Sequence, residues 1–208
     1  GGPWNIMNGV AGLLNVLTIC GWAGIIISRG PKKDMIWPDM LWFWIIAYDL
    51  WNFAYVYNAV GDDSFYAGAA LLVSCTIPAF FIKRGAWLQH RAQTLAFWMM
   101  FTMAFPTFVS SSQFAVKSSH DPVALFWVSA LALAANIAVV VYQIYTIVKR
   151  RRNPLTDELF THLPAYRSVL EANKPLVPAV AGAPVGGPAG GAVGSGSAAQ
   201  SRATAGAK

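Results

Sequence analysis

One carboxylate stands out among the residues that could do chemistry, because it lies inside a long apolar and aromatic stretch. Asp49 sits near the middle of the stretch from Trp37 to Asn58, which is long enough to cross a bilayer as a helix. An isolated charge at the centre of a membrane helix costs at least about 2.5–3.5 kcal/mol. We therefore expect Asp49 to have a partner, a bound proton or access to water.

Further polar and aromatic side chains are expected around Asp49, either on its own helix or at a similar depth on other apolar stretches. On the same stretch these are Asn52, three residues later on the same helix face, and the aromatic residues Tyr48 and Trp51 beside it; on the other stretches they are Asn15, Thr76, Thr102 and Asn136. Transport proteins place binding sites at this depth, but amides and hydroxyls also hold membrane helices together. We expect the bundle-holding role for the Asn and Thr residues and a functional role for Asp49.

Catalytic motifs are missing from the sequence. It contains no G-x-S-x-G, no H-E-x-x-H and no P-loop, and its three histidines, His90, His120 and His162, are far apart. Cys20 and Cys75 lack the spacing of a metal site, so we interpret them as packing residues. The sequence favours a protein that is not an enzyme. It indicates no metal site, and it leaves the cofactor unknown.

The elements that would position these residues are apolar stretches of membrane-spanning length. The chain is 56% hydrophobic and only 12% charged, with a mean hydropathy of +0.46. These values predict an all-α polytopic bundle with about five transmembrane helices. The expected spans are residues 5–27, 37–60, 65–82, 92–112 and 122–148.

The charge pattern predicts the orientation of these spans. Basic residues lie in every second connection and follow the last span, while the remaining connections are acidic or nearly neutral. The positive-inside rule then places the N-terminus outside and the C-terminus in the cytoplasm. The net charge of +6 is thereby explained by topology, so we expect no nucleic-acid partner. The bilayer is the expected partner, and the expected location is the cell membrane, as a multi-pass protein.

Local signals predict where some elements begin and end. Pro38 and Asp39 fit the first turn of the second span, and Asp121 before Pro122 fits the start of the fifth. Residues 153–174 are expected to form a cytoplasmic amphipathic segment, interrupted at Pro164. Residues 175–208 consist mainly of Ala, Gly, Pro, Val and Ser, so we expect a disordered tail.

Two runs of the sequence carry a resemblance to a known family. The run M-I-W-P-D-M-L-W-F-W-I-I-A-Y-D-L-W-N-F-A-Y-V-Y-N and the run F-F-I-K-R-G-A-W-L-Q-H-R-A-Q-T-L-A-F-W-M-M resemble an uncharacterised family of bacterial multi-pass membrane proteins. The resemblance covers Gly2 to about Asn173. It implies that this chain is the C-terminal part of a longer protein with further membrane helices. It also implies a location in the bacterial inner membrane, and it implies no activity.

Three functions remain open at this point. A transporter or channel would use Asp49 as its ion or proton site. A tryptophan-rich sensory type of membrane protein would stack a flat ligand on the stripe that includes Tyr48 and Trp51. A structural subunit would pack this stripe against further helices of a longer chain, a second copy or another partner. We rank transport first because a carboxylate is a poor choice for a purely structural contact in a membrane.

Overall fold

The computed structural model describes residues 2–173, and the chain over this range is mostly helical. The expected disordered tail, 175–208, lies outside the described residues. The elements in chain order are α1 (Pro3–Leu17), a 3₁₀ turn (Trp22–Gly24), β1 (Ile26–Ile27), β2 (Met35–Ile36), α2 (Trp42–Ala59), a 3₁₀ turn (Gly61–Asp63), a π-helical turn (Ser64–Ala70), α3 (Leu71–Phe81), α4 (Trp87–Ala104), α5 (Phe108–Ser111), α6 (Pro122–Arg150) and α7 (Pro164–Asn173).

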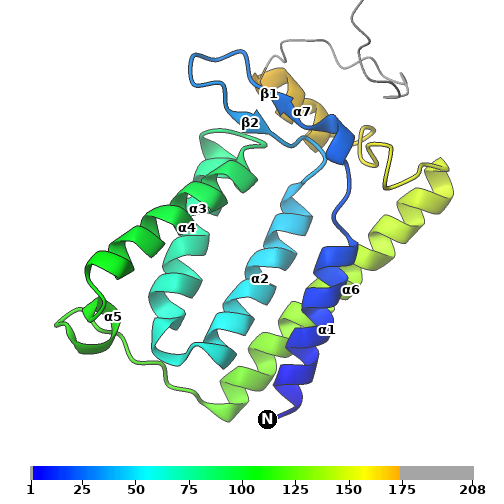
Figure 1. The fold of residues 1–208 in the computed structure, drawn as a ribbon. Helices are drawn as coiled ribbons and strands as arrows, with labels where there is room; N and C mark the ends of the chain where they lie inside the picture. The colour runs from blue at the N-terminus through cyan, green and yellow to red at the C-terminus, as the bar shows by residue number, and fades with distance from the viewer. Residues whose placement is uncertain (1, 174–208) are drawn as a thin grey trace, which may run out of the picture.

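The long helices form one bundle with a distinct cap at one end. Helices α1, α2 and α6 pack against one another, and α3 and α4 form a hairpin on the far side of α2 (Figure 1). The β1–β2 hairpin and α7 cover the end of the bundle opposite the N-terminus (Figure 1). The core joins α2, α3 and the start of α4 through Trp44, Cys75 and Trp87, with Val139 of α6 on the other side of α2.

The first apolar stretch is not one helix from 5 to 27. Helix α1 ends at Leu17, where the hydroxyl of Thr18 donates to the carbonyls of Leu14 and Asn15. Gly21 then takes a left-handed conformation with φ of 73°, and its missing side chain leaves space for Asp39. The chain continues into β1, which pairs antiparallel with β2. The connection between them is a turn, and the sequence did not predict these two short strands.

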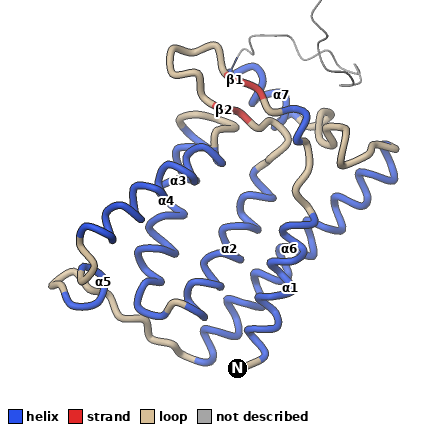
Figure 2. The backbone as a smooth tube through the Cα atoms, in the orientation of Figure 1, coloured by secondary structure: helices blue, strands red, loops and turns tan. Residues whose placement is uncertain are grey.

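The second stretch forms a helix only from Trp42, so Pro38 and Asp39 do not lie in its first turn. Tertiary hydrogen bonds hold the preceding residues outside the helix. The backbone N–H of Trp37 donates to the carbonyl of Gly85, and its indole N–H donates to the carbonyl of Cys20. Figure 2 shows this part of the chain as a loop between β2 and α2.

The fourth stretch begins earlier and ends earlier than 92–112. Helix α4 starts at Trp87 and ends at Ala104, two residues before Pro106, and α5 is a separate short helix. A proline disfavours helical conformation in the residue before it, which explains this end. The predicted start of α6 is confirmed, because a side-chain oxygen of Asp121 accepts hydrogen bonds from the N–H groups of Val123 and Ala124.

The segment after α6 packs onto the bundle. Leu159, Phe160 and Tyr166 are buried beside Cys20 and Leu41. Pro164 begins α7 and does not interrupt it. At the end of α7 the Asn173 amide donates to the carbonyl of Arg84.

Among the described residues, two helical segments are long and apolar enough to cross a membrane, Gly61–Phe81 and Pro122–Arg150. By length and composition alone this is weak evidence for a membrane location, because the core helix of a soluble protein can pass the same test.

Candidate functional site

Asp49 points from α2 towards the α3–α4 hairpin. The hydroxyl of Thr76 donates to Oδ2 of Asp49 at 2.6 Å, and the indole N–H of Trp87 donates to the same hydroxyl at 2.9 Å. The hydroxyl of Thr76 therefore accepts a hydrogen bond from Trp87 of α4 and donates one to Asp49 of α2. The structure brings Asp49 and Thr76 together, as expected from the sequence, and adds Trp87 as the third member of the chain of hydrogen bonds.

Arg91 is the basic residue beside this chain. It lies one turn after Trp87 on α4 and is only 9% exposed. Its Nη2 donates to the side-chain oxygen of Asn52 over 3.4 Å, and it is close enough for its charge to interact with Asp49. Within the described residues, however, no ion pair joins Arg91 to Asp49.

Three atoms of this site are buried without a hydrogen-bond partner among the described residues. They are Oδ1 of Asp49 and the Nε and Nη1 of Arg91. Buried polar groups are nearly always paired, so an unpaired acceptor on Asp49 and two unpaired donors on Arg91 require an explanation. Such a site can bind a proton on the carboxylate, or an ion or a small polar molecule between the two charged groups.

Asp49 lies close to the middle of α2. It is seven residues after Trp42, the first of the 18 residues of this helix, which corresponds to about 10 Å along it. The sequence-based depth of Asp49 counted residues 37–41 as helical, and they are not, but the helix that begins at Trp42 still has Asp49 near its centre.

The aromatic residues of the stripe pack against one another. Tyr48 lies between Trp44 and Trp51, with its ring centroid 4.9 Å from that of Trp87. The indole of Trp51 donates to the backbone carbonyl of Asn8 on α1. Tyr48 and Trp51 thus join α1, α2 and α4 beside the Asp49 site, but they form no hydrogen bond with Asp49.

Asn15 and Asn136 form a second polar cluster on the opposite face of α2. The amide of Asn15 donates to Oδ1 of Asn136, and the amide of Asn136 donates to the carbonyls of Ala47 and Ala132. Ala47 is two residues before Asp49, so the two clusters lie at nearly the same level but on opposite sides of the helix. The structure brings these asparagines together with each other and not with Asp49.

Thr102 is outside both clusters. Its hydroxyl donates only to the carbonyls of Trp98 and Met99 in its own helix.

The sequence reasoning missed Arg91 and Trp87. It placed Arg91 in a cytoplasmic connection as a topology signal, whereas the structure buries Arg91 against α2. The spacing of Trp87, Arg91 and Trp98 at four and seven residues was the available signal, because it places all three on one face of a helix that begins at Trp87.

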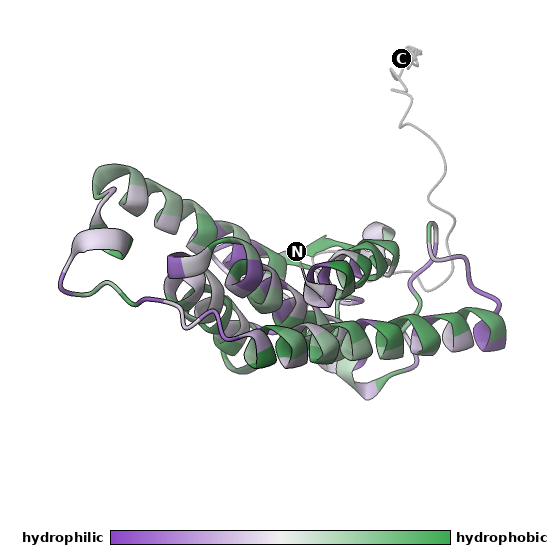
Figure 3. Cartoon of the chain, turned by 90° about the horizontal axis from the view of Figure 1, so that it is seen from below, coloured by the Kyte–Doolittle hydropathy of each residue, from purple (hydrophilic) through white to green (hydrophobic). Residues whose placement is uncertain are grey.

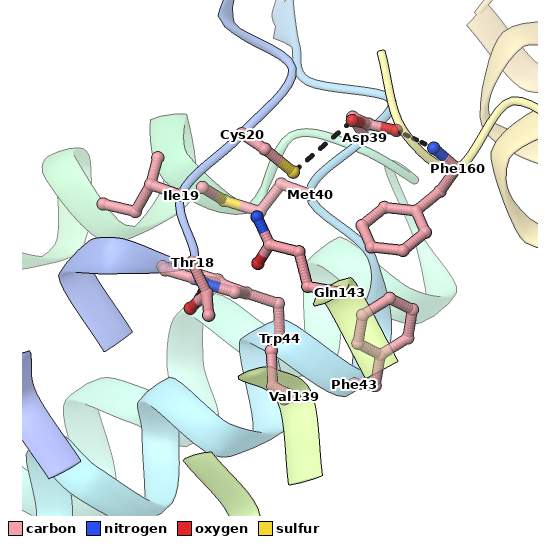
Figure 4. A pocket seen from close by; sticks show the side chains of 10 residues that line it. All are labelled: Thr18, Ile19, Cys20, Asp39, Met40, Phe43, Trp44, Val139, Gln143 and Phe160. Atoms are coloured by element: carbon pink, nitrogen blue, oxygen red, sulfur yellow. Dashed lines mark hydrogen bonds between the residues drawn. The ribbon is translucent and has the colours of Figure 1, made fainter. Parts of the chain in front are cut away.

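A second buried carboxylate, Asp39, lies in the loop before α2. Its two oxygens accept hydrogen bonds from the backbone N–H groups of Leu159 and Phe160 at 2.8 Å, and the Cys20 thiol donates at 3.5 Å. Figure 4 shows the bonds with Phe160 and Cys20. Burial raises the pKa of Asp39, although these hydrogen bonds oppose the increase. The adjacent cavity has about 10 Å³, room for roughly one water molecule. We interpret Asp39 as a structural clamp.

A metal site finds no support among residues 2–173, since no group of three His, Cys, Asp or Glu side chains is close enough to bind an ion there.

Comparisons with known proteins confirm one part of the resemblance seen in the sequence, the match to an uncharacterised family. No curated protein and no solved structure matches the chain. A family model matches residues 1–172, which include every residue of the two polar clusters. The chain belongs to the family described as "Family of unknown function (DUF5692)".

Proposed function

We propose that this chain works within a bilayer as a transporter or channel for an ion or a small polar solute, which binds at the site between Asp49 and Arg91. The observation that carries this proposal is the set of unpaired atoms, Oδ1 of Asp49 and Nε and Nη1 of Arg91. A structural ion pair would satisfy these atoms directly. A site that loads and releases a proton or solute requires groups that are not permanently paired.

Exposed apolar surface supports the placement in a bilayer. In the apolar windows of Gly61–Phe81 and Pro122–Arg150, only 33% and 28% of the residues are buried. Hydrophobic residues run along most of α6 (Figure 3), and large apolar side chains such as Trp127, Val141 and Ile144 are exposed on it. The core helix of a soluble protein would bury such side chains, whereas lipid would cover them.

We propose five spans, formed by α1, α2, the segment 64–81, α4 and α6. The basic connections then lie at the end covered by the β hairpin and α7, which would be cytoplasmic. Helix α1, with 15 residues, is shorter than a typical span of about 20 residues. It would cross only with help from the loop that follows it or from local thinning of the bilayer.

A structural subunit remains the second candidate. Helix α4 exposes a continuous apolar face with Phe97, Met100 and Met103, which would suit contact with further helices. The sensory alternative has less support, because the rings of Trp44, Tyr48 and Trp51 contact one another and Trp87.

The test is ion flux into liposomes that contain the purified protein. Asp49→Asn keeps the shape of the side chain and its bond to Thr76 but removes the charge, so we expect flux of the transported ion to fall at least about tenfold, which corresponds to about 1.4 kcal/mol. Thr102→Val, which changes a half-buried hydroxyl outside the site, is the matched control and should keep normal flux.

H⁺, Na⁺, K⁺ and Cl⁻ would be tested one at a time with fluorescent reporters. Wild-type protein that passes none of them would rule out the ionic form of the proposal. Equal flux through the wild-type and Asp49→Asn proteins would show that Asp49 is not the coupling residue.

A further inference from the structure

We infer that the groove between α2 and α6 is a binding site for one anionic phospholipid. The acyl chains would lie in the groove, and the phosphate would lie against the basic end of α6. This inference shares the bilayer placement with the proposed function, but it does not depend on Asp49.

The groove has the size and the lining of an acyl-chain site. Its volume is about 520 Å³, within the range of small-molecule sites. Trp42 and Ile46 of α2 form one wall, Ala138 and Tyr142 of α6 form the other, and Leu163 and Pro164 close the end. Trp42 and Ile46 are exposed at its rim, so a lipid could enter from the side.

A positive charge continues the wall of the groove. Lys149 is seven residues after Tyr142, so it lies on the same face of α6, two turns or about 10 Å further along. Its Nζ is 2.6 Å from the hydroxyl of Tyr145 and 5.0 Å from the centroid of that ring. The contact with Tyr145 thus holds the lysine along α6, and its position in the helix places it on the face that carries Tyr142.

The positive charges of two arginines act where the groove closes. His162 directly precedes the groove residue Leu163, and the charges of Arg150 and Arg152 act on it. Helix α7 begins at Pro164, so the positive end of its dipole lies at the same edge. Partial burial, together with Arg150, holds the pKa of His162 below its usual range.

These observations favour an anionic lipid over a second copy of the chain. A groove that is apolar along its length and basic at one end matches an acyl chain with a phosphate head group. A second copy placed in parallel in the same membrane would bring its own Lys149–Arg152 cluster to this end, and the two clusters would repel each other.

The test is native mass spectrometry of the full chain in detergent, titrated with phosphatidylglycerol or with phosphatidylcholine of the same acyl chains. We expect one phosphatidylglycerol to bind in clear preference to phosphatidylcholine. Lys149→Gln and Arg150→Gln should each weaken phosphatidylglycerol binding about fivefold. Ala138→Trp, which fills the groove from an exposed position, should abolish it.

Controls separate this proposal from its alternatives. Lys117→Gln removes an exposed positive charge from the opposite end of the bundle and should leave binding unchanged. If Ala138→Trp does not fold, Ile46→Trp at the exposed rim replaces it. Asp49→Asn should bind lipid normally, so loss of flux with intact lipid binding would show that the two proposals are independent.

Three results would overturn the inference. Equal binding of both lipids would show that the site does not recognise an anion. Unchanged binding in Ala138→Trp or Ile46→Trp would place the lipid elsewhere. A dimer that excludes phosphatidylglycerol, and that Ala138→Trp dissociates, would show that the groove holds a second copy.

Discussion

At the scale of residues, α2 carries two polar clusters that differ in how completely they are paired. Asn136 makes three hydrogen bonds, to Asn15, Ala47 and Ala132. Asp49 makes one, to Thr76, and its second oxygen is buried without a partner. A paired cluster stabilises the bundle, whereas an unpaired acid beside a buried arginine adds no comparable stability. This difference separates a structural role for Asn136 from a functional role for Asp49.

The structural role predicts a measurable loss of stability. Asn136→Ala removes the link between α1, α2 and α6 and leaves the carbonyl of Ala47 without its donor, so we expect the free energy of unfolding to fall by about 1–2 kcal/mol. Thr102→Val, which removes only a bond within α4, should change it by less than about 0.5 kcal/mol. Reversible unfolding in mixed detergent micelles would measure both. A loss for Asn136→Ala no larger than that of the control would contradict the structural role.

At the scale of elements, the sequence predicted the start of α6 because its signal is local: Asp121 accepts hydrogen bonds from its own backbone neighbours. The end of α4 was placed too late, at residue 112, although Pro106 follows Ala104 by two residues. The start of α2 depends instead on contacts with Gly85, Leu159 and Phe160, which lie far away in the chain. The local sequence around Pro38 and Asp39 does not indicate these contacts. The sequence therefore predicted that the two residues lie in the first helical turn.

The candidate site shows the same limit. Asp49 was identified because a carboxylate in an apolar stretch is a local anomaly, and Thr76 was found by its depth. Arg91 was missed because its charge was attributed to a cytoplasmic loop. Its burial depends on α4 beginning at Trp87 and on its packing towards Asn52. The pairing of Asn15 with Asn136 likewise depends on the contact of α1 with α6, which residue spacing does not specify.

The clamp at Asp39 predicts how the last described element is held. Asp39→Asn replaces one carboxylate oxygen by an N–H₂ group, which cannot accept from Leu159 or Phe160. We expect the free energy of local unfolding of the segment 153–173 to fall by about 1–3 kcal/mol, while α1, α2 and α6 stay folded. Hydrogen exchange would show faster exchange in 153–173 alone. Asp157→Asn, in an exposed turn of the same segment, is the control, and equal effects of the two variants would contradict a specific clamp.

At the scale of the whole molecule, the two ends of the bundle differ in charge and in structure. One end carries the β hairpin, α7 and most of the basic residues, and the other carries the N-terminus, α5 and the acidic turn with Asp62 and Asp63 (Figure 1). If the bundle spans a membrane, the positive-inside rule places the first end in the cytoplasm. An odd number of spans is needed to bring the N-terminus and the end of α6 to opposite sides.

This arrangement can be tested by labelling single cysteines in intact cells, in a background where Cys20 and Cys75 are Ser. Asp62→Cys and Ser119→Cys are at exposed positions of the end that carries the N-terminus. Pro31→Cys and Leu155→Cys are at exposed positions of the end that carries the β hairpin and α7. None of these four substitutions removes a basic residue. A membrane-impermeant maleimide should label the first pair directly and the second pair only after the membrane is opened. The charge pattern requires this result, because moving the capped end outside would translocate the basic connections against the orientation rule. Labelling of Pro31→Cys or Leu155→Cys in sealed cells would reverse the orientation, and labelling of all four would show that the bundle does not separate two compartments.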